Sequence, residues 1–287
     1  MITHPVFSNL KLHSNGELYK VLGVGIEKRR TMHEWPLSCV QELQLYNGTK
    51  WIYKSQRPPT VEASFYEHAR SDLLPAHRYL GKFDHCDTMI LEYIDAPLLC
   101  HKGCEEKDFV EHGRQIVTEI GHIEGELPVY LDISSQDAWI DFAQMTLKNL
   151  RKLVDDGRFS LISAKAIENL KSWVQSTNTL KTVTNGSRVK HGDLKGDQVF
   201  ITADGYRVID WQRPIIAPPD VDFVSLLVSQ KIDPMKYVDP EIIRIYGFLR
   251  LYWAVEAQLH LFPDQKWPLF QKWALEAINY IKNTVRL

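Results

Sequence analysis

Hydrophobic residues in the first third of the chain form short runs bounded by turn residues, a pattern typical of β-strands. These runs are rich in Leu, Val, Ile and aromatic residues and lie at 18–26, 37–45, 50–54 and 87–94. Between two of them, the Asn-Gly pair within 46–49 predicts a tight hairpin turn. After a Pro-Pro break, Thr60 can cap a helix that extends over 60–73. The pattern therefore predicts a small sheet with one helix within residues 1–95.

Beyond residue 97, hydrophobic positions recur every three to four residues, which is the period of an amphipathic helix. Helices are predicted at 107–125, 134–155, 164–175, 240–261 and 267–285. A hairpin-like block at 189–210, with turn residues at 203–205, interrupts them. A β-rich first third followed by a mostly helical remainder predicts an α+β fold with two lobes. We expect an N-terminal lobe at 1–95 and a C-terminal lobe at 96–287.

Composition and charge are those of an ordinary globular protein. Of the 287 residues, 44% are hydrophobic, and 34 Lys and Arg against 36 Asp and Glu leave a net charge of −2. This balance does not favour nucleic acid or an anionic membrane surface as a partner. The most apolar stretch, 245–262, is too polar to span a bilayer, because it contains Arg250, Glu256, Gln258 and His260. Without a recognisable signal peptide or disulfide framework, a cytoplasmic protein is expected.

Two acidic residues mark the part of the chain that carries chemistry. Asp193 lies in a glycine-containing loop, His191-Gly192-Asp193, whereas Asp210 ends a β-branched strand and is followed by Trp211. Such an arrangement can bring two carboxylates to one cleft, as metal-assisted phosphoryl transfer requires. One carboxylate then orients the attacking hydroxyl and accepts its proton, while the other holds Mg²⁺ against the nucleotide phosphates.

The loop resembles the catalytic loop of the aminoglycoside phosphotransferase and choline kinase branch of the protein-kinase-like superfamily, which reads H-G-D-x-x-x-x-N. Asp210 matches the metal-binding aspartate of that branch, and the segment 218–223 is similar to its G-P-x-x-x-D-L-A motif. The resemblance implies a two-lobed kinase-like fold and a catalytic role for Asp193. It also implies that His191 and Asp222 are structural supports of the loop.

The resemblance extends to the first lobe. Lys54 ends an aromatic-rich strand, as does the superfamily's nucleotide-binding lysine, and would contact the α- and β-phosphates. Glu62 would pair with Lys54 and fix its position, and Glu67 is the alternative partner. The spacing of the two glutamates on a helix does not allow both to face the same side. In the strand that resembles the family's hinge, the backbone of Glu92 and Ile94 would bind adenine.

Three features depart from the family pattern. Gln198 replaces the asparagine that helps to hold the metal, and its amide oxygen makes it our second candidate ligand for Mg²⁺. Lys195 occupies a position where lysine is typical of Ser/Thr protein kinases, in which it touches the transferred phosphate, and we assign it to catalysis. The loop expected at 29–36 contains no glycine, although glycine lets backbone N–H groups approach phosphate closely.

These residues predict an ATP-dependent phosphotransferase that moves the γ-phosphate to a hydroxyl group of a small molecule, with ATP and Mg²⁺ as cofactors. Gln198 and the glycine-free loop leave a second hypothesis open, a pseudokinase-like module that binds a nucleotide or metabolite without turnover. A protein acceptor is disfavoured, because the segment between Asp210 and Asp222 is too short for a long activation loop. A zinc site around 100–104 is disfavoured by its cysteine spacing.

The acceptor cannot be chosen from the sequence. Aminoglycosides, choline, sugars and amino alcohols are all substrates on this scaffold, so a choice among them would rest on analogy of fold alone. Glu256 and Glu276 in the C-terminal helices are candidates for contacting a cationic acceptor. The oligomeric state is equally open.

Overall fold

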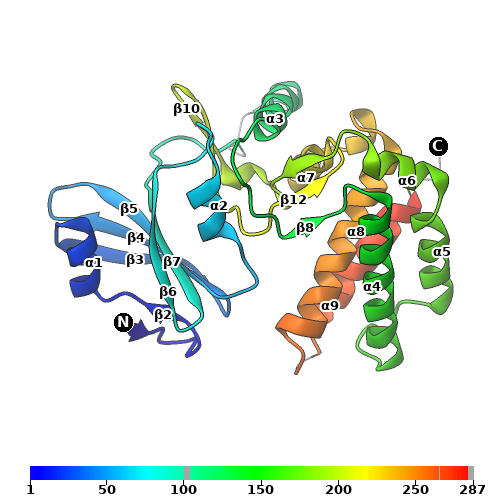
Figure 1. The fold of residues 1–287 in the computed structure, drawn as a ribbon, viewed down its shortest axis with the longest axis horizontal. Coiled ribbons are helices and arrows are strands. Elements are labelled where there is room, and N and C mark those ends of the chain that lie inside the picture. Colours follow the sequence, from blue (N-terminus) through cyan, green and yellow to red (C-terminus); the bar gives the residue numbers. More distant parts are fainter. Residues whose placement is uncertain (100–103, 265, 284–287) are drawn as a thin grey trace. The chain divides into compact units, whose positions relative to one another are not determined.

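The chain divides into two compact units. The computed structural model describes residues 1–99, 104–264 and 266–283 (Figure 1). Unit 1 comprises Met1–Cys104, His122–Tyr130 and Gly196–Pro214, and unit 2 comprises Glu105–Gly121, Leu131–Lys195 and Ile215–Leu287. Each unit thus combines segments that are distant in the sequence, whereas the two predicted lobes follow a single division after residue 95.

Unit 1 contains a five-stranded antiparallel sheet with the strand order β3-β4-β5-β7-β6. Its strands are β3 (Ile26–Trp35), β4 (Ser38–Leu45), β5 (Lys50–Gln56), β6 (His77–Phe83) and β7 (Cys86–Glu92). β4 and β5 form the predicted hairpin, and Gly48 in its turn has a φ of 83°, which suits glycine. β5 pairs with β4 on one side and β7 on the other, so its backbone is fixed along both edges.

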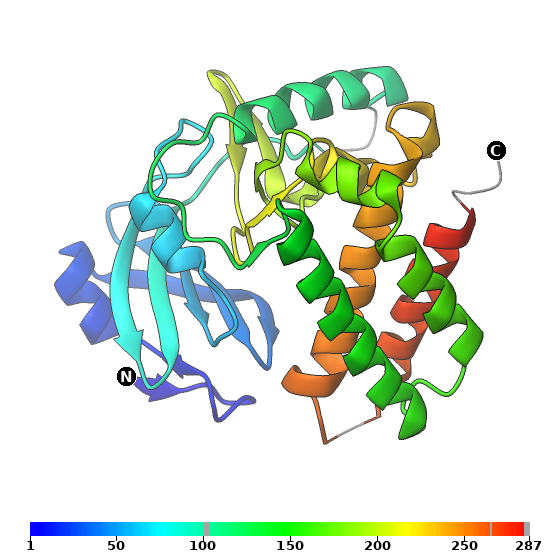
Figure 2. The same ribbon diagram turned by 45° about the vertical axis from the view of Figure 1, so that its right-hand side comes forward.

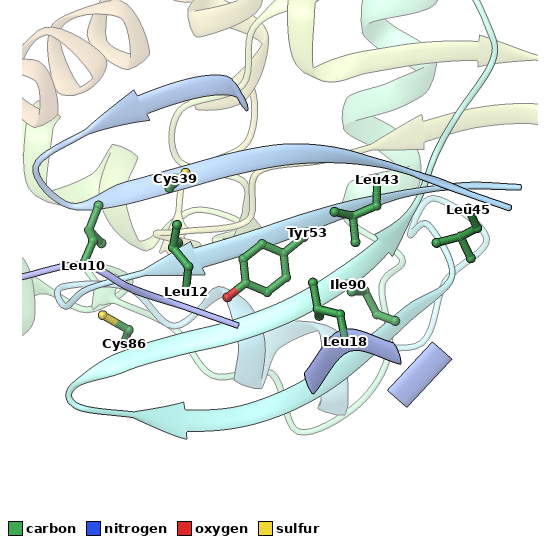
Figure 3. Packing of buried hydrophobic residues seen from close by; sticks show 9 residues of the cluster. All are labelled: Leu10, Leu12, Leu18, Cys39, Leu43, Leu45, Tyr53, Cys86 and Ile90. Carbon is green, nitrogen blue, oxygen red and sulfur yellow. The ribbon is translucent and has the colours of Figure 1, made fainter. Parts of the chain in front are cut away.

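The N-terminal segment covers one face of this sheet (Figure 3). It contains β1 (Ile2–Thr3), β2 (Lys11–Leu12) and α1 (Asn15–Leu22). A buried cluster joins this segment to the sheet through Leu10, Leu12, Leu18, Cys39, Leu43, Leu45, Tyr53, Cys86 and Ile90. Each large side chain of this kind contributes roughly 1.5–3 kcal/mol when fully buried. The cluster therefore holds the N-terminal segment against the strands.

The strand predicted at 18–26 is wrong over most of its length, because Asn15–Leu22 forms helix α1. Its first turn has a capping box. The Ser14 side chain accepts a hydrogen bond from the Glu17 backbone, and the Glu17 carboxylate accepts one from the Ser14 N–H at 2.8 Å. The box satisfies two backbone donors that a helix start leaves open, and this outweighs the strand preference of the Leu, Tyr and Val that follow.

The loop expected at 29–36 is also wrong in its bounds, because most of it belongs to β3 and only Pro36-Leu37 forms the turn. β3 is an edge strand, and its side chains are mostly exposed and polar. The sequence therefore lacks the alternation of hydrophobic and polar residues that would have predicted a strand here. Arg29 donates to Gln41 Oε1 at 2.6 Å and to the His13 carbonyl at 2.7 Å. This guanidinium therefore links β3 to β4 and to the N-terminal segment.

Helix α2 (Glu62–His68) lies against β6 and β7, and it is shorter than the helix predicted at 60–73. The N-cap is Val61 and not Thr60 as predicted, although Thr60 Oγ1 accepts a hydrogen bond from the Glu62 N–H at 3.2 Å. A hairpin of β10 (Val199–Thr202) and β11 (Gly205–Val208) completes unit 1, preceded by the short helix η1 (Gly196–Gln198). Backbone hydrogen bonds from Leu99 to Val199 and from Val208 to Leu73 tie this hairpin to the rest of the unit.

Gly125 lies where the segment 122–130 passes the end of α2. Its φ is +121°, and a Cβ added there would lie 2.0 Å from the His68 carbonyl oxygen. We expect Gly125→Ala to lower the free energy of unfolding by at least about 2 kcal/mol, because both the conformation and the contact become strained. Gly205→Ala is the matched control, with a φ of +135° but no atom within 4 Å of the new Cβ. Equal losses in chemical denaturation of the two variants would contradict the close approach.

Unit 2 is mostly helical, in agreement with the predicted α+β fold. Its helices are α3 (Glu106–Ile120), α4 (Gln136–Asp155), α5 (Ala164–Val174), α6 (Thr177–Thr184), α7 (Val221–Ser229), η2 (Pro234–Lys236), α8 (Pro240–Glu256), η3 (Ala257–Leu261) and α9 (Pro268–Asn283). α8 packs against α4, α6, α7 and α9 (Figure 2). None of the helices within the described ranges is long and apolar enough to cross a bilayer.

Two features hold unit 2 together. Aromatic rings from α4, α5 and α8 contact one another, and they belong to Trp139, Phe142, Trp173, Phe248 and Tyr252. A small sheet with the strand order β8-β12-β9 consists of β8 (Leu131–Asp132), β9 (Arg188–Lys190) and β12 (Ile215–Ala217). The end of β9 is the point from which the loop with Asp193 begins.

Candidate active site

In unit 1, the structure brings together three of the residues singled out from the sequence, Lys54, Glu62 and Asp210. Lys54 projects from β5 and is only 5% exposed, and its Nζ lies 2.6 Å from Glu62 Oε2 and 2.6 Å from Asp210 Oδ1. Glu62 is the first residue of α2 and is fully buried, whereas Glu67 is exposed. Of the two candidate glutamates, Glu62 is thus the one that pairs with Lys54. We call these three residues the lysine cluster.

Burial and the attraction between opposite charges together shift the pKa values of Glu62 and Lys54. It raises the pKa of Glu62, because a carboxylate loses its hydration there and the attraction of Lys54 only partly compensates. Burial also opposes the charge of Lys54, yet Asp210 and Glu62 outweigh it and hold the pKa of Lys54 above its usual value. The cluster therefore fixes a cation whose position is determined by two carboxylates.

Asp210 receives hydrogen bonds from three side chains. Lys54 Nζ and Gln212 Nε2 donate to Oδ1, at 2.6 and 2.7 Å, and Gln198 Nε2 donates to Oδ2 at 3.2 Å. Asp210 has a positive φ of 75°, a conformation that is uncommon outside glycine and occurs often at functional sites. Gln212 was not predicted as a site residue, although an amide side chain two residues after Asp210 is close enough in sequence to have suggested a contact.

The segment that carries Asp210 is anchored next to α2. The Trp211 ring stacks on Phe65 with their centroids 4.5 Å apart, and its indole N–H donates to the Val208 carbonyl at 3.0 Å. One residue further, the Gln212 carbonyl accepts a hydrogen bond from the Val61 N–H at 3.0 Å. Trp211 therefore fixes Asp210 opposite the helix that supplies Glu62.

The donor atoms near Asp210 suit Mg²⁺. This ion prefers oxygen ligands, and proteins usually hold it through one or two carboxylates together with substrate phosphates. Asp210 supplies one carboxylate. Flipping the side-chain amide of Gln198 would place its oxygen where its NH₂ group now lies, beside Asp210. Within the described ranges, no group of three or more His, Cys, Asp or Glu residues could hold a metal by itself. Most of the zinc candidate at 100–104 lies outside the described residues.

The predicted hinge residues line a cavity in unit 1. Its volume is about 430 Å³, within the size range of small-molecule sites, and its walls include Glu92, Ile94, Pro97, Ile201 and Arg207. The Glu92 backbone N–H donates to the Ala76 carbonyl at 2.8 Å. Because this N–H is already bonded, a backbone contact between Glu92 and adenine would use the Glu92 carbonyl oxygen.

In unit 2, Asp222 fixes the loop that carries Asp193. Asp222 lies in the first turn of α7, is 1% exposed, and accepts hydrogen bonds from the backbone N–H groups of His191 at 2.6 Å and Gly192 at 2.9 Å. His191 is also buried, and its Nδ1 accepts a weaker bond from the Asp193 N–H at 3.4 Å. A buried carboxylate bonded to two backbone donors gives the loop one defined conformation.

The same loop presents Asp193 to solvent. The Asp193 side chain is 61% exposed, and Lys195 Nζ lies 2.8 Å from its Oδ2. The Lys195 side chain is itself 43% exposed, so this pair is a weak one in water. A rigid loop that holds an exposed carboxylate beside a lysine is suited to accept a proton from a hydroxyl group and to stabilise negative charge near it.

Comparisons with known proteins identify the fold. No protein-family model matches the chain, and no curated protein sequence matches it. Solved structures do match. A thermostable mutant of aminoglycoside phosphotransferase APH(4)-Ia, in a ternary complex with ADP and hygromycin B, has a TM-score of 0.64 and 14% identity over 95% of this chain and 99% of its own.

Two further structures extend the comparison. Spectinomycin phosphotransferase APH(9)-Ia, in complex with ADP and spectinomycin, has a TM-score of 0.57 and 12% identity over 96% of this chain and 100% of its own. A choline/ethanolamine kinase family protein from Mesorhizobium loti has a TM-score of 0.58 and 14% identity over 91% of this chain and 88% of its own. The chain therefore has the kinase-like fold of these phosphotransferases, as the resemblance of its motifs predicted.

Proposed function

We propose that the chain is an ATP-dependent phosphotransferase that transfers the γ-phosphate to a hydroxyl group of a small molecule. The observation that carries the proposal is the lysine cluster, because a buried Lys54 held by both Glu62 and Asp210 is an arrangement suited to nucleotide phosphates. Structural neighbours that bind ADP support the nucleotide assignment. The low identity to these neighbours leaves the acceptor to be found by experiment.

The residues of unit 1 would bind the nucleotide. Lys54 would contact the α- and β-phosphates, and the backbone around Glu92 and Ile94 would contact adenine. Asp210 and Gln198 would hold Mg²⁺, which when bound neutralises charge on the phosphates. Fixing the cation of Lys54 in advance avoids reorganisation during the reaction, so the cluster acts mainly by positioning and electrostatics.

The residues of unit 2 would act on the acceptor. Asp193 would orient the acceptor hydroxyl and accept its proton as the oxygen attacks the γ-phosphorus. A new oxygen–phosphorus bond forms, the bond between the γ-phosphorus and the β–γ bridging oxygen breaks, and ADP leaves. Lys195 would stabilise charge on the phosphoryl group in transit, while His191 and Asp222 keep the loop in place.

The alternative is a kinase-like module that binds nucleotide without turnover. The observation that favours it is the hydrogen bond from Gln198 Nε2 to Asp210 Oδ2, because it uses the Gln198 amide as a donor. Asp210 then provides a single carboxylate for the metal. This module would bind ATP but release no ADP with any acceptor.

Product analysis separates the two functions. The protein is incubated with ATP, Mg²⁺ and a panel of aminoglycosides, amino alcohols, sugars and hydroxy acids. The proposed enzyme gives a new phosphomonoester signal in ³¹P NMR together with an equal amount of ADP, and chelation of Mg²⁺ removes both. Nucleotide binding without a new ester across the panel would favour the non-catalytic module.

A further inference from the structure

A cavity of about 180 Å³ lies among α7, α8 and α9 in unit 2. Its walls include Tyr246, Gly247 and Arg250 of α8 and Glu276 and Tyr280 of α9. Gly247 lets the two helices approach closely, because a Cβ on it would lie 2.9 Å from Ile281 Cγ1. The cavity is smaller than the 300–1,000 Å³ usual for drug-sized ligands, so it suits a compact molecule.

Arg250 differs from four other arginines of this unit. Arg114, Arg151, Arg158 and Arg244 each form an ion pair with a carboxylate at 2.7–3.0 Å. The one hydrogen bond of the Arg250 guanidinium within the described ranges is to the Tyr246 hydroxyl, at 3.4 Å, and no carboxylate there lies within 4.0 Å of it. A half-buried guanidinium without a carboxylate partner in a cavity is suited to an anionic group of a ligand.

The surroundings of Arg250 combine charges of both signs. Burial opposes its positive charge, but Tyr246, Asp193 and Glu276 attract it and raise its pKa overall. The candidate base Asp193 therefore lies within electrostatic reach of this guanidinium. Glu276 is 54% exposed, and its nearest cation is Lys272 at 3.8 Å, so its carboxylate can also receive a cationic ligand group.

We propose that this cavity binds the acceptor and that the acceptor is a small hydroxy amino acid. Its carboxylate would form a forked pair of hydrogen bonds with Arg250, assisted by the Tyr246 hydroxyl, and its ammonium group would face Glu276. Its hydroxyl would then be the group that Asp193 deprotonates and that receives the γ-phosphate, with ADP as the other product. This assignment rests on the proposed phosphotransferase function and keeps Glu276 as a contact for a cationic group of the acceptor.

Matched acceptors test the assignment. Serine, homoserine and threonine are compared with ethanolamine, which lacks the carboxylate of serine, and with 3-hydroxypropionate, which lacks its amine. We expect at least one of the hydroxy amino acids to be phosphorylated with a lower KM than both analogues. Preference for ethanolamine, or no phosphorylation of the three amino acids, would overturn the assignment.

A variant of the anchoring residue gives the second readout. Arg250→Met is expected to raise the KM for the preferred amino acid about 10- to 100-fold, the usual effect of losing a charge-assisted hydrogen bond, with kcat and ATP affinity unchanged. The KM of Arg250→Lys should lie between those of the unmodified protein and Arg250→Met. Arg151→Met, which removes a surface ion pair, should change neither KM nor kcat. A fall in kcat or in ATP affinity with KM unchanged would assign Arg250 to catalysis or to the nucleotide and contradict acceptor binding.

The two proposals fail in different ways. A Mg²⁺-dependent shift in melting temperature with ATP tests the nucleotide site without any acceptor. If that shift is present and only amine-bearing acceptors without a carboxylate are phosphorylated, the phosphotransferase function stands and the amino acid assignment falls. If ATP does not bind, both the phosphotransferase function and the amino acid assignment are wrong.

Discussion

Replacing Asp193 by asparagine is expected to lower the rate of phosphoryl transfer by about 10²–10⁴-fold, the range typical of losing a general base. Asparagine keeps the size of the side chain but cannot take the proton from the acceptor hydroxyl. The stability should change little, because the Asp193 side chain is 61% exposed and its ion pair with Lys195 is open to solvent. Steady-state ADP release with the preferred acceptor measures the loss as a decrease in kcat.

The control for this variant is Asp197→Asn, which makes the same change at an exposed aspartate of η1. It should keep the activity of the unmodified protein, and both variants should keep its Tm and its affinity for ATP. An Asp193→Asn protein with undiminished kcat would show that another group accepts the proton.

Replacing Lys54 by methionine is expected to lower the free energy of unfolding by about 3–5 kcal/mol, since it leaves the fully buried Glu62 without its counter-ion. For a chain of this size the Tm should fall by roughly 6–20 °C. Lys50→Met is the matched control on the same strand, where the Lys50 ammonium is exposed and lies 3.7 Å from Glu42. Differential scanning calorimetry of both variants measures the difference.

The loss of unfolding free energy in Lys54→Met should also depend on pH. Burial already raises the pKa of Glu62, and loss of Lys54 raises it further, so the folded state favours the neutral acid more than the unfolded chain does. A raised folded-state pKa of an acid makes the protein more stable as pH falls toward the ordinary value for glutamate. The variant should therefore lose less stability at pH 5 than at pH 8.

A second substitution separates stability from binding. Lys54→Met combined with Glu62→Gln removes the buried charge and should recover part of the lost stability, whereas ATP binding should stay absent in both proteins. Recovery of ATP binding in the double variant would mean that Lys54 does not contact the nucleotide.

Much of the fold could be predicted because local signals agreed with it. The Asn-Gly turn within 46–49 marked the β4–β5 hairpin, and the periodic segment 164–175 coincides with α5 to within one residue. α1 was missed because the Leu, Val and Tyr residues within 18–26 were interpreted as a strand, although Ser14 and Glu17 had the spacing of a capping box. β3 was missed because an edge strand with exposed charged residues lacks a hydrophobic alternation.

The candidate site also contains residues that the sequence predicted and residues that it did not. The acidic residues Asp193, Asp210 and Asp222 could be singled out because their motifs are local and their order along the chain is specific. The hydrogen bond from Gln212 to Asp210 could not, and neither could the lack of a carboxylate partner for Arg250 among the residues that the structure describes, because both depend on tertiary packing around single side chains. Sequence reasoning thus found the candidate reacting groups, while the acceptor hypothesis needed the structure.

A thermal-shift titration with ATP tests the central claim most directly, because it needs no knowledge of the acceptor. The unmodified protein is compared with Asp210→Asn, with and without Mg²⁺, and Asp72→Asn at an exposed site of unit 1 is the control. Ligand at 100 times its dissociation constant stabilises by about 2.7 kcal/mol, or roughly 5–10 °C. We predict such a shift with ATP and Mg²⁺, present in the control and lost in Asp210→Asn. A shift that is absent in the unmodified protein, or that is the same in Asp210→Asn, would contradict a metal–nucleotide site at Asp210.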